Sequence, residues 1–280
     1  MCQFCVQHGD GEKWYLQAQN YTADLESDLR RRGYIIDFVQ GFDRMRSRAL
    51  LATRAIDIAP QALSSAVKRT VSDRQQEHHY GQPVPIEECE RIFGFATSIV
   101  RLPCVCRTAA GTPDRAYCIA VTTKPMDDVL AEAFRGYETG PDTAGLERLT
   151  KEQAMELLRD CEREGLMHSV WTFITPFIGA ICNCDLASGC MAMNMTVGHD
   201  IKVMWKGEYV AELDATACTG CGACVSRCPF NAIDAPPDRH QPAVLRQQDC
   251  YGCGVCRAAC TAGAIKLLDR AAVPLVASAW

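Results

Sequence analysis

The sequence lacks several patterns that identify common classes of protein. Its 280 residues contain no apolar run of about eighteen residues, so no transmembrane segment is expected. The first residues do not have the charged-then-apolar layout of a signal peptide. No phosphate-binding glycine fingerprint, Walker loop or Ser–His–Asp signature occurs. These absences predict a cytoplasmic protein and give no sign of a nucleotide-binding or hydrolytic site.

An excess of basic residues is absent too. The net charge is -5, whereas broad binding to nucleic acid or to an anionic membrane needs a basic face. Basic clusters at residues 29–33 and 44–48 have acidic residues nearby, which favours solvated helix faces over a docking patch. Only six histidines occur, and we expect His8 and His168 to be structural. No nucleic-acid partner is predicted.

Cysteine, by contrast, is abundant, with 18 residues. Disulfides are rare in a reducing cytoplasm, so cysteines there are more often metal ligands than cross-links. The last third of the chain supports this reading, because it contains the spacing C-x2-C-x2-C-x3-C twice, 32 residues apart. The spacing, the interleaved glycines and the flanking residues all repeat, which indicates a duplicated unit. The eight cysteines are Cys218, Cys221, Cys224 and Cys228, then Cys250, Cys253, Cys256 and Cys260.

Three thiolates at i, i+3 and i+6 can converge on one face of a cubane cluster, and glycines allow the backbone to approach it closely. Zinc sites more often pair two C-x2-C knuckles. The two runs therefore predict two [4Fe-4S] clusters.

This part of the chain resembles the bacterial two-[4Fe-4S] ferredoxin family. In that family the fourth cysteine of each run binds the other cluster. The resemblance implies one cluster on Cys218, Cys221, Cys224 and Cys260, and a second on Cys250, Cys253, Cys256 and Cys228. The sequence departs from the family at Thr261, where the first run has Pro229 in the matching position.

Ten cysteines lie upstream of these runs. Cys89 and Cys161 fall in helical apolar patterns and are predicted to be buried core residues. The other eight are clustered and predict one or two further metal sites, either [4Fe-4S] clusters or zinc. Cys2 and Cys5 either join a ligand set or stay unliganded at a mobile terminus. The eight residues are Cys2, Cys5, Cys104, Cys106, Cys118, Cys182, Cys184 and Cys190.

The stretches "LPCVCR", "EREGLMH" and "ICNCDLASGC" occur in this order between residues 86 and 195. They resemble the upstream part of cysteine-rich proteins of anaerobes that carry a ferredoxin tail. The resemblance implies cluster binding and no particular activity.

The predicted fold class is α+β, with a mostly helical cysteine-rich N-terminal/middle domain followed by a two-[4Fe-4S] ferredoxin-like domain. The expected divisions are a helical N-terminal region at 1–85, a cysteine-rich mixed α/β domain at 86–207 and the ferredoxin-like domain at 208–280. Gly33 is expected to break a helix and Pro60 to interrupt another. A strand is expected at 117–123, a hairpin around Gly207, and a helix opened by a capping box at Thr150 and Gln153.

These features predict an electron-transfer protein, a subunit or partner of a larger oxidoreductase in an anaerobic or microaerobic cell. It would form a hetero-oligomeric complex and relay single electrons between a catalytic subunit and a soluble carrier. The alternative is an iron–sulfur reductase with an open coordination position in the upstream domain. A redox sensor is a third possibility, because residues 150–171 resemble the recognition half of a winged-helix domain, but the acidic surroundings argue against DNA binding.

Overall fold

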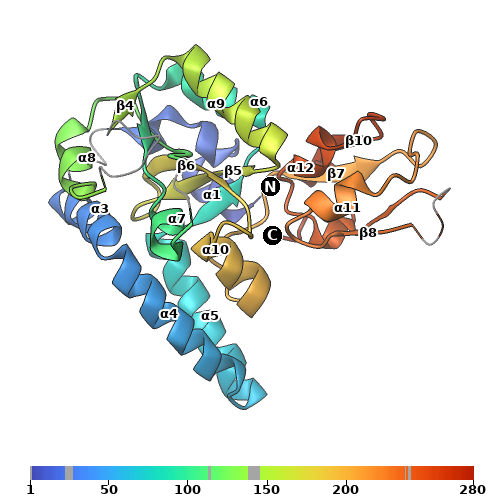
Figure 1. The fold of residues 1–280 in the computed structure, drawn as a ribbon, viewed down its shortest axis with the longest axis horizontal. Helices are drawn as coiled ribbons and strands as arrows, with labels where there is room; N and C mark the ends of the chain where they lie inside the picture. The colour runs from blue at the N-terminus through green and yellow to red at the C-terminus, as the bar shows by residue number, and fades with distance from the viewer. Residues whose placement is uncertain (1, 23–27, 113–114, 138–145, 237, 239–240) are drawn as a thin grey trace.

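The computed structural model describes residues 2–22, 28–112, 115–137, 146–236, 238 and 241–280 (Figure 1). We call residues 2–206 the upstream body and residues 208–280 the C-terminal module. The two lie side by side, and the module extends away from the body (Figure 1). The chain combines many helices with antiparallel sheets, which confirms the α+β class.

A six-stranded sheet forms the centre of the upstream body, in the order β1-β5-β6-β3-β2-β4. Every pair of neighbours in it is antiparallel. The strand expected around residues 117–123 is β3, one of the two central strands. The strands are β1 (Gly81–Pro83), β2 (Ser98–Leu102), β3 (Cys118–Thr122), β4 (Glu147–Arg148), β5 (Met167–Thr172) and β6 (Ile178–Cys184).

Helices dominate the chain before the first strand of this sheet, and further helices alternate with its strands. The two longest, α4 and α5, form an arm that projects from the body (Figure 1). Pro60 caps the start of α5 and so separates the two helices, as predicted. The helices of the body are α1 (Gln3–His8), α3 (Leu29–Gln40), α4 (Phe42–Asp57), α5 (Gln61–His78), α6 (Ile86–Phe95), α7 (Val105–Ala110), α8 (Asp127–Ala133), α9 (Lys151–Glu164) and α10 (Met191–Met193), with short turns η1 (Trp14–Leu16), η2 (Ala18–Tyr21) and η3 (Asn194–Gly198).

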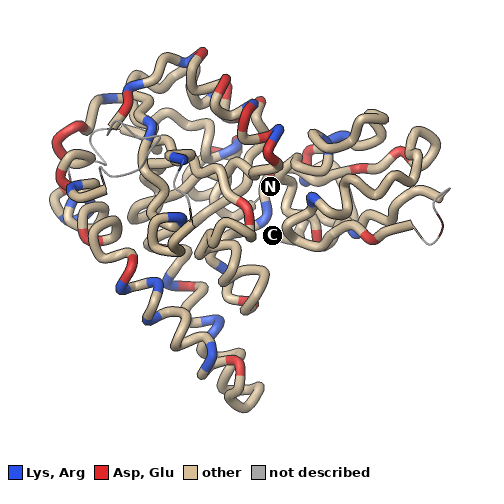
Figure 2. The backbone as a smooth tube through the Cα atoms, in the orientation of Figure 1, with Lys and Arg blue, Asp and Glu red and all other residues tan. Residues whose placement is uncertain are grey.

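Two expectations about the helix α3 were wrong. The helix α3 runs through Gly33 without a break, because a single glycine costs a helix only about 1 kcal/mol and packing overrides it. Arg31, in the first turn of the same helix, is buried instead of solvated, and its Nε donates to the Phe173 carbonyl at 3.0 Å. Elsewhere acidic and basic residues are interspersed over the backbone (Figure 2).

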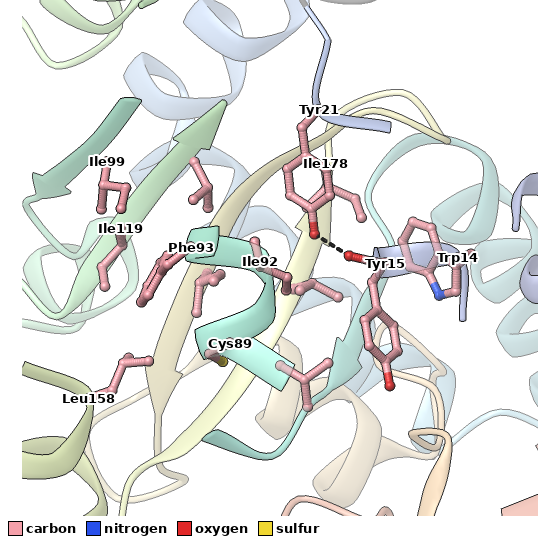
Figure 3. Packing of buried hydrophobic residues seen from close by; sticks show 14 of the residues in the cluster. Trp14, Tyr15, Tyr21, Cys89, Ile92, Phe93, Ile99, Ile119, Leu158 and Ile178 are labelled. Atoms are coloured by element: carbon pink, nitrogen blue, oxygen red, sulfur yellow. Dashed lines mark hydrogen bonds between the residues drawn. The ribbon is translucent and has the colours of Figure 1, made fainter. Parts of the chain in front are cut away.

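The main core lies where α6 and α9 pack against the sheet and the first turns of the chain (Figure 3). The helix α9 begins with the predicted capping box: Gln153 N donates to Thr150 Oγ1 at 3.2 Å, and Thr150 N donates to Gln153 Oε1 at 2.8 Å. It ends at Gly165, whose φ of 86° suits glycine. Cys89 and Cys161 are fully buried, as predicted.

The C-terminal module is built on a two-stranded antiparallel ribbon of β7 and β10. The sequence predicted that residues 202–214 form a hairpin around Gly207, and this is wrong. The strand β7 pairs instead with β10, because the duplicated unit brings its own last strand back beside it. The module contains β7 (Tyr209–Leu213), α11 (Ala223–Arg227), β8 (Ile233–Asp234), β9 (Val244–Leu245), η4 (Gln247–Asp249), α12 (Val255–Ala258), β10 (Ile265–Asp269) and η5 (Arg270–Ala272).

Among the described residues, none of the helices combines the length and apolarity that crossing a bilayer requires.

The core around α9 should dominate the stability of the upstream body. Leu158 is fully buried there, so Leu158→Ala should lower the free energy of unfolding by about 2–5 kcal/mol through lost contacts and a cavity. Leu63 on α5 is 56% exposed, so Leu63→Ala should change it by less than about 0.5 kcal/mol. Denaturant unfolding of both variants under argon, followed by circular dichroism, checks this. Equal effects of the two substitutions would contradict the packing.

Candidate metal centres

The eight cysteines of the C-terminal module line two separate recesses. The first recess is lined by Cys218, Cys221, Cys224 and Cys260. The second is lined by Cys228, Cys250, Cys253 and Cys256. The crossover arises because each triple run wraps one recess, while the fourth cysteine follows a short helix that points toward the other.

The backbone of each run is shaped by glycine and supplies N–H donors to sulfur. Gly222 and Gly254 precede α11 and α12 with φ of 74° and 80°, a conformation that strains other residues. Ala232 N donates to Cys228 Sγ, and the matching Ala264 N donates to Cys260 Sγ, both at 3.3 Å. The duplication seen in the sequence therefore extends to the hydrogen bonds around the thiols, which tune a cluster once it is bound.

Burial raises the pKa of the Cys253 thiol well above its ordinary value, and it raises that of Cys256 to about 12. Cys221 is exposed, and hydrogen bonds from the Ala223 backbone and the Thr219 side chain lower its pKa. Thiols buried in this way ionise when a metal replaces the proton. The second recess thus favours protonated thiols or metal-bound thiolates over free thiolates.

Six upstream cysteines meet at the end of the sheet. Cys118 begins β3 and lies between two of them: its Sγ is 3.5 Å from Cys104 Sγ and 3.8 Å from Cys182 Sγ. Cys182 and Cys184 share one face of β6, since they are two residues apart. We call this set, which lines one cavity of about 220 Å³, the six-cysteine group; its members are Cys104, Cys106, Cys118, Cys182, Cys184 and Cys190.

The thiols of the six-cysteine group influence one another's protonation. Contacts with the Cys106 and Cys184 thiols lower the pKa of Cys190, and the contact with Cys190 raises that of Cys106. Contacts with Cys118 and Cys184 lower the pKa of Cys182 to about 6. Such splitting arises when neighbouring acids share protons. A cation at the cavity would remove this competition by binding the thiolates.

Arg107 is the basic residue of this site, and the sequence analysis did not single it out. Burial opposes its charge, but the negative charges of Cys104 and Cys184 outweigh that effect and raise its pKa. It also lies 3.7 Å from Asp185 and over the Tyr117 ring. Its position in "LPCVCR", directly after Cys106, was the available signal.

Asn183 stands between Cys182 and Cys184 and points to the other side of the strand. Its Oδ1 lies 2.6 Å from His168 Nδ1, and its Nδ2 donates to the Tyr117 carbonyl at 2.5 Å. His168 is buried, and burial lowers its pKa to about 4. This neutral histidine orients the strand that carries two thiols and does not line the six-cysteine cavity.

Most of the rest of the cavity wall is apolar, although Gln75 and His79 also line it. Phe38, Phe42, Trp171 and Phe173 line it, together with methionines such as Met195. A cavity of about 220 Å³ is far larger than one metal ion, so it suits a multi-atom cluster or a small apolar molecule. The site is therefore a set of thiols beside a largely apolar cavity.

Cys2 and Cys5 do not belong to this group. They are buried with Glu208, a residue that the sequence analysis missed, in the N-terminal part of the body. The structure therefore divides the eight upstream cysteines into six and two, and not into two sets of four. Nothing in the spacing of Cys2 and Cys5 identifies an acidic partner some two hundred residues away.

The six-cysteine group and the second recess share one packed region. Cys182, Cys184, Cys190 and Cys253 all belong to it. The module is also fixed to the body by an ion pair between Arg257 and Glu87 at 2.8 Å. One packed cluster of side chains thus connects the six-cysteine group with the second recess.

Comparison with known families assigns the module but not the body. Residues 217–264 match the family described as the 4Fe-4S dicluster domain. Among curated proteins, none matches the chain. The matched residues include all eight cysteines of the two recesses. At residues 217–264, therefore, the chain contains a ferredoxin-like 4Fe-4S dicluster domain, which is a domain of iron–sulfur electron transfer.

Proposed function

We propose that this chain relays single electrons through three iron–sulfur centres as a subunit or partner of a larger oxidoreductase. Two [4Fe-4S] clusters would occupy the recesses of the C-terminal module, each with the four cysteines that line its recess. A third would bind within the six-cysteine group. The proposal places the N-terminal region at 1–85, the middle domain at 86–207 and the ferredoxin-like domain at 208–280.

The observation that carries the proposal is the convergence of six thiols on one cavity packed against the second recess. An electron relay needs centres that lie close to one another, and this shared packing supports such an arrangement. Cys221 of the first recess is exposed, so electrons would exchange with a soluble carrier at that end. The inner end would face a catalytic subunit, for which the projecting arm offers exposed Leu51, Ile58 and Leu63.

The number of thiols and the size of the cavity support an iron–sulfur cluster, and not zinc, as the third centre. Sulfur atoms 3.5–3.8 Å apart would suit a single tetrahedral ion, whose bonds of about 2.3 Å place thiolates about 3.8 Å apart. One zinc ion, however, takes four ligands and needs no chamber. Six thiols around about 220 Å³ favour a cluster with spare thiols beside it. None of the eighteen cysteines, all of which the structure describes, forms a disulfide.

A reductase is the second candidate, favoured by the apolar wall of the same cavity. There the third centre would keep an open coordination position and reduce a small apolar substrate. Carbon monoxide should then change the electron paramagnetic resonance spectrum of the third centre and leave the other two unchanged. A spectrum without change would remove the reductase and leave the relay.

The third centre should be visible in the metal content. We expect about twelve irons with matching acid-labile sulfide per anaerobically purified chain, and about eight in the double variant Cys182→Ala/Cys184→Ala. The matched control Cys89→Ala/Cys161→Ala removes two buried thiols outside the six-cysteine group and should keep about twelve. Eight irons in the unaltered chain would defeat the proposal, and zinc that disappears in the first variant would make the site structural.

Arg107 should set the reduction potential of the third centre. Reduction adds negative charge, so the nearby guanidinium stabilises the reduced form. A unit charge several Å away contributes about 2 kcal/mol at an effective dielectric constant near 20, or roughly 90 mV for one electron. Arg107→Ala should therefore lower the potential by about that amount in a spectroscopic redox titration. Arg163→Ala, an exposed arginine paired with Asp160, should leave it unchanged; an equal shift in both would refute a local effect.

A further inference from the structure

Cys2, Cys5 and Glu208 form a second, separate group of potential metal ligands. Cys2 directly precedes α1, Cys5 lies in the first turn of that helix, and Glu208 directly precedes β7. The two Sγ atoms lie 3.5 Å apart, and Cys5 Sγ lies 3.0 Å from Glu208 Oε1. One ligand atom from each of the three residues lies within 4.8 Å of the others. The group therefore has the size of a single-ion site.

Burying the Glu208 carboxylate without a neighbouring cation costs free energy. Glu208 is 2% exposed, and no ion pair joins it to a basic side chain in the described part of the chain. The guanidinium of Arg270 is close enough to interact with the charge of Glu208, but it donates its hydrogen bonds to the carbonyls of Gly207, Tyr209 and Cys250. A carboxylate taken out of water needs a partner of opposite charge or a metal. The two thiols beside it supply no positive charge.

Unpartnered hydroxyl groups lie against the same turn. The Tyr80 ring stacks on Phe4, between the two cysteines, at 3.9 Å. The hydroxyls of Tyr80 and Tyr15 are buried and have no hydrogen-bond partner among the described residues. Burial, followed by the charges of Cys2, Glu208 and Cys5, raises the pKa of Tyr80. Buried polar atoms left unpaired in a protein structure indicate a missing partner such as a water or an ion.

We propose that Cys2, Cys5 and Glu208 bind one zinc-class divalent cation, with a water as the fourth ligand. For two thiolates and a carboxylate around a tetrahedral ion, bonds of about 2.3 Å to sulfur and 2.0 Å to oxygen match the Cys2–Cys5 and Cys5–Glu208 separations to within about 0.5 Å. The soft thiolates disfavour calcium and magnesium. The metal-bound water supplies the partner that the two tyrosine hydroxyls lack.

The cation joins the beginning of the chain to the entry of the C-terminal module. Glu208 is followed by β7, and Arg270 N donates to the Glu208 carbonyl at 2.8 Å. The same Arg270 holds the carbonyl of Cys250, the first cysteine of the second recess, at 2.6 Å. The ion therefore stabilises the junction next to the second recess, whatever the number of clusters.

Metal analysis of the full-length chain tests this site. The chain, purified anaerobically and washed with a chelator, is incubated with Zn²⁺ and desalted, and zinc and iron are measured together. We expect about one zinc per chain, with about two sulfur and two oxygen neighbours at the zinc absorption edge. Iron does not contribute at that edge, so the clusters leave the measurement untouched.

Two variants and a control separate this site from the six-cysteine group. Cys5→Ala and Glu208→Gln should each weaken zinc binding at least tenfold while iron content stays unchanged, and Cys89→Ala should alter neither. Glu208→Gln keeps the size of the side chain, so it remains informative if Cys5→Ala fails to fold. A chain that takes up no zinc, zinc retained in both variants, or a shell of four sulfurs would overturn the proposal. A missing third iron centre, by contrast, would change only the iron count.

Discussion

The pairing of β3 with β6 is the contact on which the six-cysteine group depends. Ile119 lies opposite Ile181 and Ala120 opposite Ala180, and this register brings Cys118 beside Cys182. A slip of one residue would turn Cys182 and Cys184 to the other face of the sheet, because side chains alternate along a strand. Asn183 opposes such a slip, since its bonds to His168 and to the Tyr117 carbonyl form only when it occupies that other face. A buried polar pair thus holds the thiols in place without binding metal itself.

Two arginines place positive charge beside thiol sites, the fully buried Arg270 and the partly buried Arg107. Arg270 is fully buried and donates to the carbonyls of Gly207, Tyr209 and Cys250, so it fixes the second cysteine run onto the entry of β7. Arg107 lies beside the six-cysteine group in a similar way. A buried charge is tolerated only where other groups compensate it. Thiolate-bound centres would be anionic, so each guanidinium and a centre beside it would reduce the cost of burying the other.

Local patterns predicted much of the module and little of the tertiary arrangement upstream. The duplicated spacing, the capping box at Thr150 and the strand at β3 depend on residues near one another in sequence, and each could be inferred. The partner of β7 could not, since β10 lies more than fifty residues further on. The division of the upstream cysteines into six and two could not be predicted either, because it also depends on contacts between residues far apart in the sequence. Cys5 meets Glu208 only through the way α1 packs against the start of the module, and no spacing encodes that contact.

The exposure of the three thiol sites separates the first recess from the other two. Cys221 is exposed, whereas each cysteine of the second recess and of the six-cysteine group is buried or partly buried. Reduction adds negative charge, and burial away from water disfavours charge, so centres at these two sites would be harder to reduce than one in the first recess if burial acted alone. Arg107 would oppose that trend at the six-cysteine group. The direction in which electrons run between carrier and catalytic partner would then depend on how far a single guanidinium offsets the loss of solvent.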